Sequence, residues 1–186
     1  GQWYRELLYC WTDEKTGNTF MGNWYYDYET DTWDLFAYYD TKLIESYITG
    51  GIGATAAGEA FGKNYELPNM SAYCETCAAI GNVYVNYRLF LLHGESKYYD
   101  VLERTLYNGL ISGVSLDGGG FFYPNPLESM GQHQRQPWFG CACCPSNICR
   151  FIPSLPGYIY AVKDKDVYVN LFMSNTSDLK VGVKAV

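Results

Sequence analysis

Two tight groups of cysteines dominate the chemistry that this sequence offers. Six of the seven cysteines fall in CETC, at residues 74–77, and in CACCPSNIC, at residues 141–149. Thiolates are metal ligands and nucleophiles, whereas a disulfide framework usually spreads its cysteines through a small, loop-rich chain. The clustering therefore predicts a metal site or a reactive thiol site. It also favours a reducing compartment such as the cytoplasm.

The spacing of these cysteines allows two sets of four metal ligands. The first set consists of two CxxC pairs, as in many structural zinc sites: Cys74 with Cys77, and Cys141 with Cys144. The second set uses three thiols and one carboxylate: Cys77, Cys143, Cys144 and Glu75. In the second set Pro145 favours the backbone bend that two adjacent ligands need. Against both sets stands the hypothesis that these cysteines are small buried hydrophobic side chains.

Three glutamates in a segment of low charge are candidates for acid/base chemistry. They are Glu59 in GEAF, Glu66 in YELPN and Glu75 in CETC. A glutamic acid can protonate a glycosidic oxygen, and aromatic residues, which make up 18% of this chain, stack on sugar rings. A carboxylic acid, a thiolate and many aromatic side chains would together suit sugar chemistry. A solvated surface position is nevertheless the commoner role of any single glutamate.

The two histidines and the short motifs are less informative. His93 precedes Gly94 at the end of a predicted helix, where capping or packing is the usual role, whereas His133 lies in a long loop and is a candidate ligand contact. Asn69 and Asn175 begin glycosylation sequons, which are short patterns that often occur by chance. The sequence contains no P-loop, no Rossmann glycine pattern after a strand, and no GxSxG.

Composition and charge exclude several classes of protein. The 186 residues are 48% hydrophobic, enough to bury a core, which rules out a disordered or collagen-like chain. The longest apolar runs have five residues, against about 20 for a membrane span, so we expect no membrane segment. The net charge of −7 argues against nucleic acid as a partner, because phosphate binding needs clustered Lys and Arg.

Hydrophobic periodicity predicts helices first and strands at the end. Helices are expected over residues 34–48, 71–92, 96–111 and 146–155, where apolar side chains recur every three or four residues. Residues 1–32 predict irregular structure or short strands, and residues 121–145 predict a long loop of the kind that usually carries function. From residue 158 onward, alternating patterns predict a meander of three strands, so we expect a domain boundary near residue 157.

The longer motifs resemble glycoside hydrolase family 127, the β-L-arabinofuranosidase family. The similarity covers about residues 47–175 and rests on YITGGIGA, GEAF, YELPNMSAYCETCAAIGN and WFGCACCPSNICR, together with the segment 89–127. Members of this family have an (α/α)6 barrel followed by β-sandwich domains. The resemblance therefore implies a mainly α fold, with a catalytic portion of such a barrel at residues 1–157 and the start of an antiparallel β-sandwich at residues 158–186. Residues 1–46 match the barrel helices of the family poorly.

The resemblance also implies an activity and a site. The activity is that of a retaining glycoside hydrolase, which releases β-L-arabinofuranose from an arabinose-containing oligosaccharide or glycan. By the same resemblance, Zn²⁺ is held by Glu75, Cys77, Cys143 and Cys144. Cys143, the first cysteine of the CC pair, is then the nucleophile and Glu59 the acid/base.

Other classes of function stay open at this point. A closed zinc site with four ligands also fits a structural role. The alternative is therefore a non-catalytic, zinc-stapled module for carbohydrate binding or assembly, with a thiol redox protein as a third class. The chain begins with glycine and ends within an alternating pattern, so we expect it to be a piece of a longer protein whose activity this piece alone does not guarantee. A homo-oligomer is compatible with the sequence.

Overall fold

The computed structural model describes residues 5–12, 15, 19–27, 32–40, 46–63 and 66–182. The chain divides into two compact units, Gly1–Glu45 and Ser46–Val186. All of the cysteine and glutamate motifs considered above lie in the second unit. In the part of the chain that the structure describes, no helix has the length and apolar character needed to cross a membrane.

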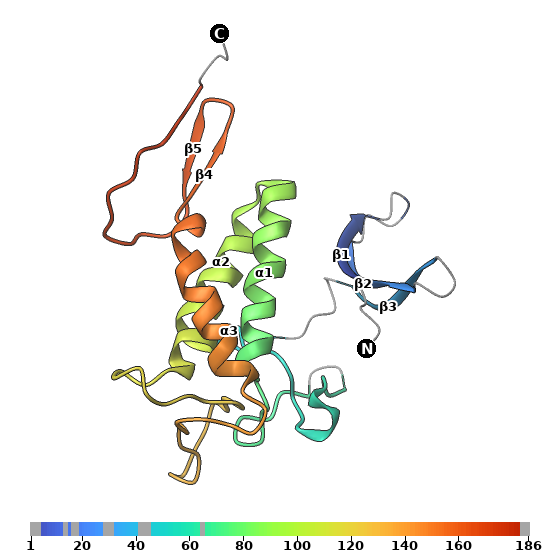
Figure 1. The fold of residues 1–186 in the computed structure, drawn as a ribbon, viewed down its shortest axis with the longest axis vertical. Helices are drawn as coiled ribbons and strands as arrows, with labels where there is room; N and C mark the ends of the chain where they lie inside the picture. The colour runs from blue at the N-terminus through green and yellow to red at the C-terminus, as the bar shows by residue number, and fades with distance from the viewer. Residues whose placement is uncertain are drawn as a thin grey trace. The chain divides into compact units, whose positions relative to one another are not determined.

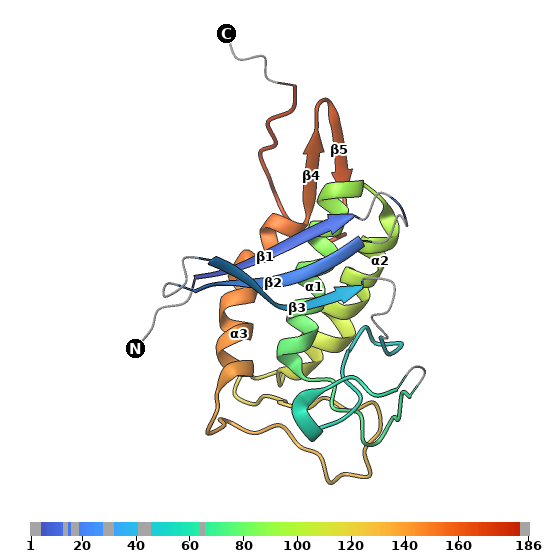
Figure 2. The same ribbon diagram turned by 90° about the vertical axis from the view of Figure 1, so that its right-hand side faces the viewer.

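The first unit is a three-stranded antiparallel sheet (Figure 2). Its order is β1-β2-β3, with β1 at Arg5–Thr12, β2 at Thr19–Asp27 and β3 at Thr32–Asp40. The short strands expected within residues 1–32 are thus confirmed. The helix predicted over residues 34–48 is wrong, because the aromatic-rich sequence of β3 favours a strand and pairs with β2. Residues 41–45 of that prediction lie outside the described residues.

The described residues of the second unit include three α-helices, which lie side by side in Figures 1 and 2. They are α1 at Thr76–His93, α2 at Ser96–Arg104 and α3 at Cys143–Phe151. A π-helical stretch, Thr105–Leu110, and a 3-10 turn, Ile111–Gly113, continue α2, and 3-10 turns also occur at Ala57–Glu59 and Ile152–Tyr158. The predicted helices are confirmed here, although α1 begins five residues later and α3 three residues earlier than predicted.

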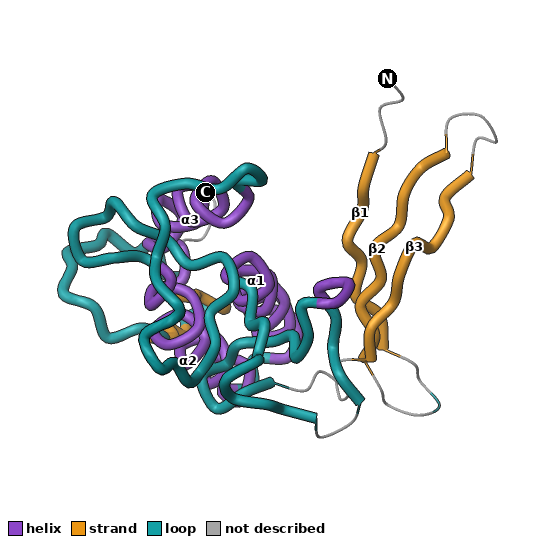
Figure 3. Tube along the Cα trace, turned by 90° about the horizontal axis from the view of Figure 1, so that it is seen from below, coloured by secondary structure: helices purple, strands orange, loops and turns teal. Residues whose placement is uncertain are grey.

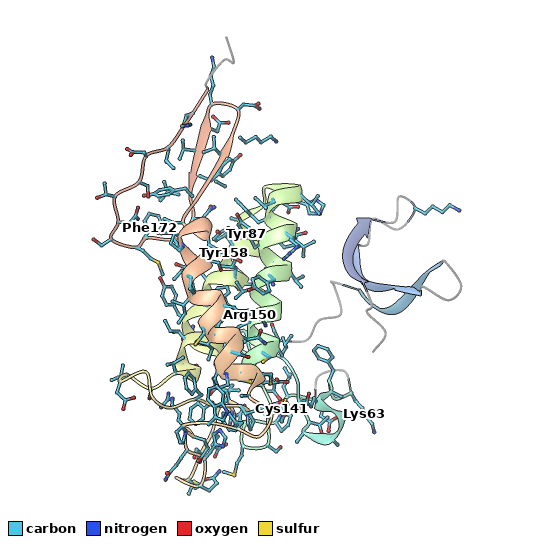
Figure 4. The ribbon with its side chains drawn as sticks, in the orientation of Figure 1. Lys63, Tyr87, Cys141, Arg150, Tyr158 and Phe172 are labelled. Atoms are coloured by element: carbon cyan, nitrogen blue, oxygen red, sulfur yellow. The ribbon has the colours of Figure 1, made fainter. Side chains whose placement is uncertain are left out.

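Apolar side chains of the three helices pack into one buried cluster. Leu102, Leu106 and Phe151 are at most 1% exposed, and burying each side chain contributes about 1.5–3 kcal/mol. Tyr87 of α1 and Tyr158, just after α3, extend this packing with ring centroids 4.4 Å apart (Figure 4). The cluster fixes α3 against α1, which matters because each helix begins at a cysteine motif.

A two-stranded antiparallel hairpin follows the helices. It consists of β4 at Tyr160–Lys163 and β5 at Asp166–Val169, and it confirms the turn predicted at KDKD. Leu171, which is 1% exposed, belongs to the same buried cluster as the helices. The third predicted strand is absent over residues 179–182, and its remaining residues lie outside the described part of the chain.

Two long loops lead into α1 and α3 (Figure 3). The first covers most of residues 46–75 and the second covers residues 114–142, which confirms the predicted loop before α3. A buried hydrogen bond holds the first loop against α1: Nδ2 of Asn82 on α1 donates to the carbonyl oxygen of Gly50 at 3.0 Å. These loops and the starts of the two helices carry the candidate site.

Candidate metal centre and catalytic site

The segment 73–76, which runs into α1, lies between two loops and bonds to both. On one side the amide of Cys74 donates to the carbonyl of Gly53 at 2.9 Å. On the other side the amide of Thr76 donates to the carbonyl of Tyr123 at 3.0 Å. Backbone hydrogen bonds therefore fix the start of α1 against both loops, and the side chains of all three segments form one site.

Four potential metal ligands converge at the starts of α1 and α3: Glu75, Cys77, Cys143 and Cys144. One ligand atom from each residue lies within 4.8 Å of all the others. The Sγ atom of Cys144 lies 3.3 Å from that of Cys77 and 3.8 Å from that of Cys143. Oε1 of Glu75 lies 3.5 Å from the Cys143 sulfur and 3.6 Å from the Cys144 sulfur.

These separations fit a tetrahedral zinc ion. Zn–S bonds of about 2.3 Å and a Zn–O bond of about 2.0 Å imply S···S separations of about 3.8 Å and S···O separations of about 3.5 Å. The Cys143–Cys144 separation of 3.8 Å and the S···O separations of 3.5 and 3.6 Å match these values, whereas the Cys77–Cys144 separation of 3.3 Å is shorter. Thiolates also select zinc over the hard cations Ca²⁺ and Mg²⁺. The donor set is thus compatible with Zn²⁺ in both chemistry and geometry.

The structure brings together the second of the two predicted ligand sets. Cys74 is 2% exposed and packs with Tyr47 and Ala72 in a separate small cluster. Cys141 is exposed in the loop before α3 (Figure 4). The six cysteines whose side chains are described, from Cys74 to Cys149, are all free thiols.

Helix starts and hydrogen bonds favour negative charge on the ligands. Cys77 lies in the first turn of α1 and the CC pair begins α3, where the unpaired amide groups of a helix stabilise thiolates. Hydrogen bonds, first from Cys144 and then from Asn147, lower the pKa of Cys77. The Asn147 contact joins Nδ2 to the Cys77 sulfur at 2.9 Å.

The other two thiols are held in the neutral form. Burial raises the pKa of Cys143 to about 11, and a hydrogen bond from Tyr123 opposes that rise. The hydrogen bond that Cys144 donates to Cys77 raises the pKa of Cys144, and burial adds to the effect. Without a bound cation, both thiols are therefore protonated at neutral pH.

Glu59 lies beside two tyrosine hydroxyls. Its Oε1 atom accepts a hydrogen bond from Tyr73 at 2.9 Å and another from Tyr123 at 3.3 Å. An interaction with Cys143 raises the pKa of Tyr123. One hydroxyl group thus links the glutamate to the cysteine cluster.

The backbone at Glu59 adopts an uncommon conformation. Its φ is 51°, directly after Gly58 at 71°, and non-glycine residues rarely occupy this left-handed region. The paired backbone bonds between Ala54, Thr55 and Ala60 enclose the turn that holds it. Such strained positions often occur at functional sites.

Other predicted site residues have local structural contacts. Glu66 accepts a hydrogen bond from the amide of Lys63 at 2.8 Å and closes a turn. His93 is exposed at the end of α1. His133 stabilises the loop before α3. Its Nε2 atom lies 2.7 Å from the carbonyl oxygen of Pro124, and its ring stacks on the ring of Phe122 with the centroids 4.6 Å apart.

Three side chains of this site could not be recognised from the sequence: Tyr73, Tyr123 and Asn147. The chain has 19 tyrosines, and no local pattern distinguishes the two that contact Glu59. Asn147 follows the CC pair by one helical turn of α3, but the predicted helix began at residue 146, after that pair, so it did not place Asn147 on the same face as the ligands.

Comparisons with known proteins agree with the motifs. Residues 40–157 match the family model of the beta-L-arabinofuranosidase GH127 catalytic domain. The chain is 41% identical to a non-reducing end beta-L-arabinofuranosidase of Bifidobacterium longum subsp. longum, over 74% of this chain and 23% of that protein.

Solved structures lead to the same family. A GH127 beta-arabinofuranosidase is 79% identical with a TM-score of 0.73, over 74% of this chain and 22% of that chain. A GH127 beta-L-arabinofuranosidase from Geobacillus stearothermophilus T6 is 44% identical with a TM-score of 0.66, over 72% of this chain and 23% of that chain. The chain thus spans less than a quarter of the length of these relatives. Because the family model matches more than half of its residues, the chain belongs to the beta-L-arabinofuranosidase family GH127.

Proposed function

We propose that the protein containing this chain is a retaining glycoside hydrolase that releases β-L-arabinofuranose from the non-reducing ends of arabinose-containing glycans. The observation that carries this proposal is the cluster of Cys143 with Glu75, Cys77 and Cys144, together with Tyr123, which donates to Glu59 at 3.3 Å and influences the pKa of Cys143. A retaining mechanism needs an acid/base and a nucleophile about 5–5.5 Å apart in the usual two-carboxylate case. One intervening hydroxyl group is compatible with a separation of that size.

Cys143 is the nucleophile in this proposal. Its side chain is only half-buried, whereas Cys144 is 0% exposed, so Cys143 is the member of the pair that a substrate can reach. Glu75, Cys77 and Cys144 would complete the ligand set for Zn²⁺. When bound, the zinc ion would deprotonate the thiols that ligate it and so provide a thiolate at neutral pH.

The reaction has two steps, formation and hydrolysis of a glycosyl-enzyme intermediate. In the first, the Cys143 thiolate attacks the anomeric carbon and forms a C–S bond, while the C–O bond to the leaving group breaks and the Glu59 carboxylic acid protonates the departing oxygen. In the second, water attacks the same carbon, its proton passes to the Glu59 carboxylate, and the sulfur leaves as a thiolate. Two inversions give net retention.

Hydrogen bonds from Tyr73 and Tyr123 orient the Glu59 carboxyl group for proton transfer. Both hydroxyls donate to Oε1, and in the described part of the chain no hydrogen bond reaches Oε2. Oε2 is therefore the oxygen that can carry the transferred proton. The Tyr123 hydroxyl has a single proton, which it can donate either to Oε1 or to the Cys143 thiolate, and its interaction with Cys143 opposes the rise in the pKa of that thiol.

The family resemblance gives the proposal its wider architecture. The helices α1, α2 and α3 would form a portion of an (α/α)6 barrel, and residues 158–186 would begin a β-sandwich. The remaining barrel helices would come from parts of the protein outside this chain, which spans 22–23% of its relatives.

The test is hydrolysis of p-nitrophenyl β-L-arabinofuranoside by the full-length protein, with the first-formed anomer of the released sugar identified by NMR. We expect turnover with the β-anomer appearing first. First appearance of the α-anomer would contradict a cysteine nucleophile. A zinc-loaded protein without turnover on this or any arabinose-containing glycan would support the non-catalytic module instead.

A further inference from the structure

Asn147 connects the metal ligands to the surface of α3. Its Nδ2 atom donates to the Cys77 sulfur at 2.9 Å, and its Oδ1 atom accepts a hydrogen bond from Nη2 of Arg150. Asn147 is half-buried, whereas Arg150 is exposed on the outer part of α3 (Figure 4). The three side chains form a line from solvent to one ligand.

The arginine fixes the direction of the amide. An asparagine side chain can face a neighbour with either its acceptor oxygen or its donor nitrogen. An arginine has donors only, so Arg150 can bind Asn147 only through Oδ1. Because these residues are three apart on one helix face, that bond directs Nδ2 toward Cys77.

The three thiols of the ligand set therefore differ in their partners. Cys77 accepts a hydrogen bond from the amide of Asn147. Among the side chains for which bonds are described, Cys143 and Cys144 contact only other members of the ligand set. A hydrogen bond to the sulfur of a metal-bound cysteine orients that ligand and stabilises its charge.

We propose that Asn147, oriented by Arg150, is a positioning residue that anchors Cys77 in the ligand set and so leaves Cys143 as the thiolate available to substrate. The second half of this statement rests on the proposed function. The first half concerns metal retention alone and can be tested without turnover.

The test measures zinc affinity of the full-length protein by competition with a chromogenic chelator. Asn147→Asp keeps the shape but replaces the donor with a carboxylate beside the thiolate, so zinc affinity should fall roughly 10–100-fold. The matched control is Asn108→Asp. Asn108 is exposed and its amide donates to the carbonyl of Arg104 at 2.9 Å, so the same change of charge should leave zinc affinity unaltered.

Arg150→Met is a second variant that tests the inference if Asn147→Asp fails to fold. Because Arg150 is exposed, its replacement should leave the fold intact. It should lower zinc affinity in the same direction by a smaller factor, whereas Arg88→Met, at an exposed position on α1, should not. Wild-type zinc affinity in both Asn147→Asp and Arg150→Met would overturn the inference, even if the wild-type protein hydrolyses arabinofuranosides. Zinc loss in these variants of a protein that shows no turnover would instead contradict only the proposed function.

Discussion

Glu59 and Cys143 both interact with Tyr123. The Tyr123 hydroxyl donates to Oε1 of Glu59 at 3.3 Å, and its interaction with Cys143 raises the pKa of Tyr123 and opposes the rise in the pKa of Cys143. Tyr73 contacts the same oxygen of Glu59 at 2.9 Å but has no described hydrogen bond to a cysteine. The two tyrosines therefore allow the roles of the glutamate and the cysteine to be separated.

Replacement of either tyrosine by phenylalanine should lower turnover, but only Tyr123→Phe should slow the reaction of Cys143. A hydrogen bond to a charged group contributes about 1.5–3 kcal/mol, so each variant should lose about 10- to 100-fold in kcat/KM. The rate of inactivation by an arabinofuranose-shaped, cysteine-directed reagent should fall in Tyr123→Phe and stay near wild type in Tyr73→Phe. Equal inactivation rates would contradict the link through Tyr123.

Glu59→Gln should affect substrates according to their leaving groups. A poor leaving group needs a proton, so its hydrolysis should fall about 10²–10⁴-fold, whereas an activated aryl glycoside should lose much less in the first step. Steady-state kinetics on the two substrate types make the comparison. Glu66→Gln is the control, since Glu66 closes a turn and should leave both rates nearly unchanged. Equal losses on both substrates would argue against Glu59 as the acid.

The helices could be predicted from the sequence because their signals are local. The apolar side chains of α1 recur at three and four residues, and Gly94, with φ of 70°, ends the helix where the pattern stops. The strand β3 could not be predicted in this way. Leu35, Phe36 and Tyr39 fit a rough helical spacing, and only pairing with β2, a long-range interaction, selects the strand.

The ligand set was only partly predictable. Spacing alone left two sets, and the family resemblance chose between them. The structure brings together the chosen set because Cys74 has a left-handed backbone, with φ of 40°, and its side chain packs beside Tyr47 instead of joining Cys77. The partners of Glu59 come from 14 and 64 residues away, a separation that no local pattern encodes.

The order in which the cysteines react in the metal-free protein should follow their pKa values. A thiol whose pKa is raised stays protonated below that value, and only the thiolate is alkylated. Burial raises the pKa of Cys143 to about 11, whereas hydrogen bonds lower that of Cys77. After zinc removal, iodoacetamide at pH 8 should therefore label Cys77 before Cys143, and labelling of Cys143 should rise about tenfold per pH unit toward pH 11. Peptide mass spectrometry that finds Cys143 labelled first at pH 8 would contradict this order.

Gly50→Ala should destabilise the protein more than Gly118→Ala. Both glycines have left-handed backbones, with φ of 79° and 73°, so each substitution costs about 1–2 kcal/mol for conformation. A Cβ atom on Gly50 would also lie 2.2 Å from Oγ1 and 2.7 Å from Cα of Thr105, whereas nothing lies within 4 Å at Gly118. Overpacking should add about 1–3 kcal/mol at Gly50. Urea unfolding measures the loss of unfolding free energy in each variant. Equal losses would contradict the prediction, because they would show that the loop accommodates the Cβ atom at Gly50 without added strain.

The most direct test of the central claim is to identify the residue that carries the sugar. The full-length protein is treated with a cysteine-directed, arabinofuranose-shaped inactivator and the labelled peptide is sequenced by mass spectrometry, for wild type, Cys143→Ser and Cys144→Ser. A label on Cys143 is expected in the wild type. The Cys143→Ser variant should fold but show no hydrolysis, since serine without a dedicated base is a weak nucleophile. A label on Cys144 or Glu75, or hydrolysis by Cys143→Ser, would contradict Cys143 as the nucleophile.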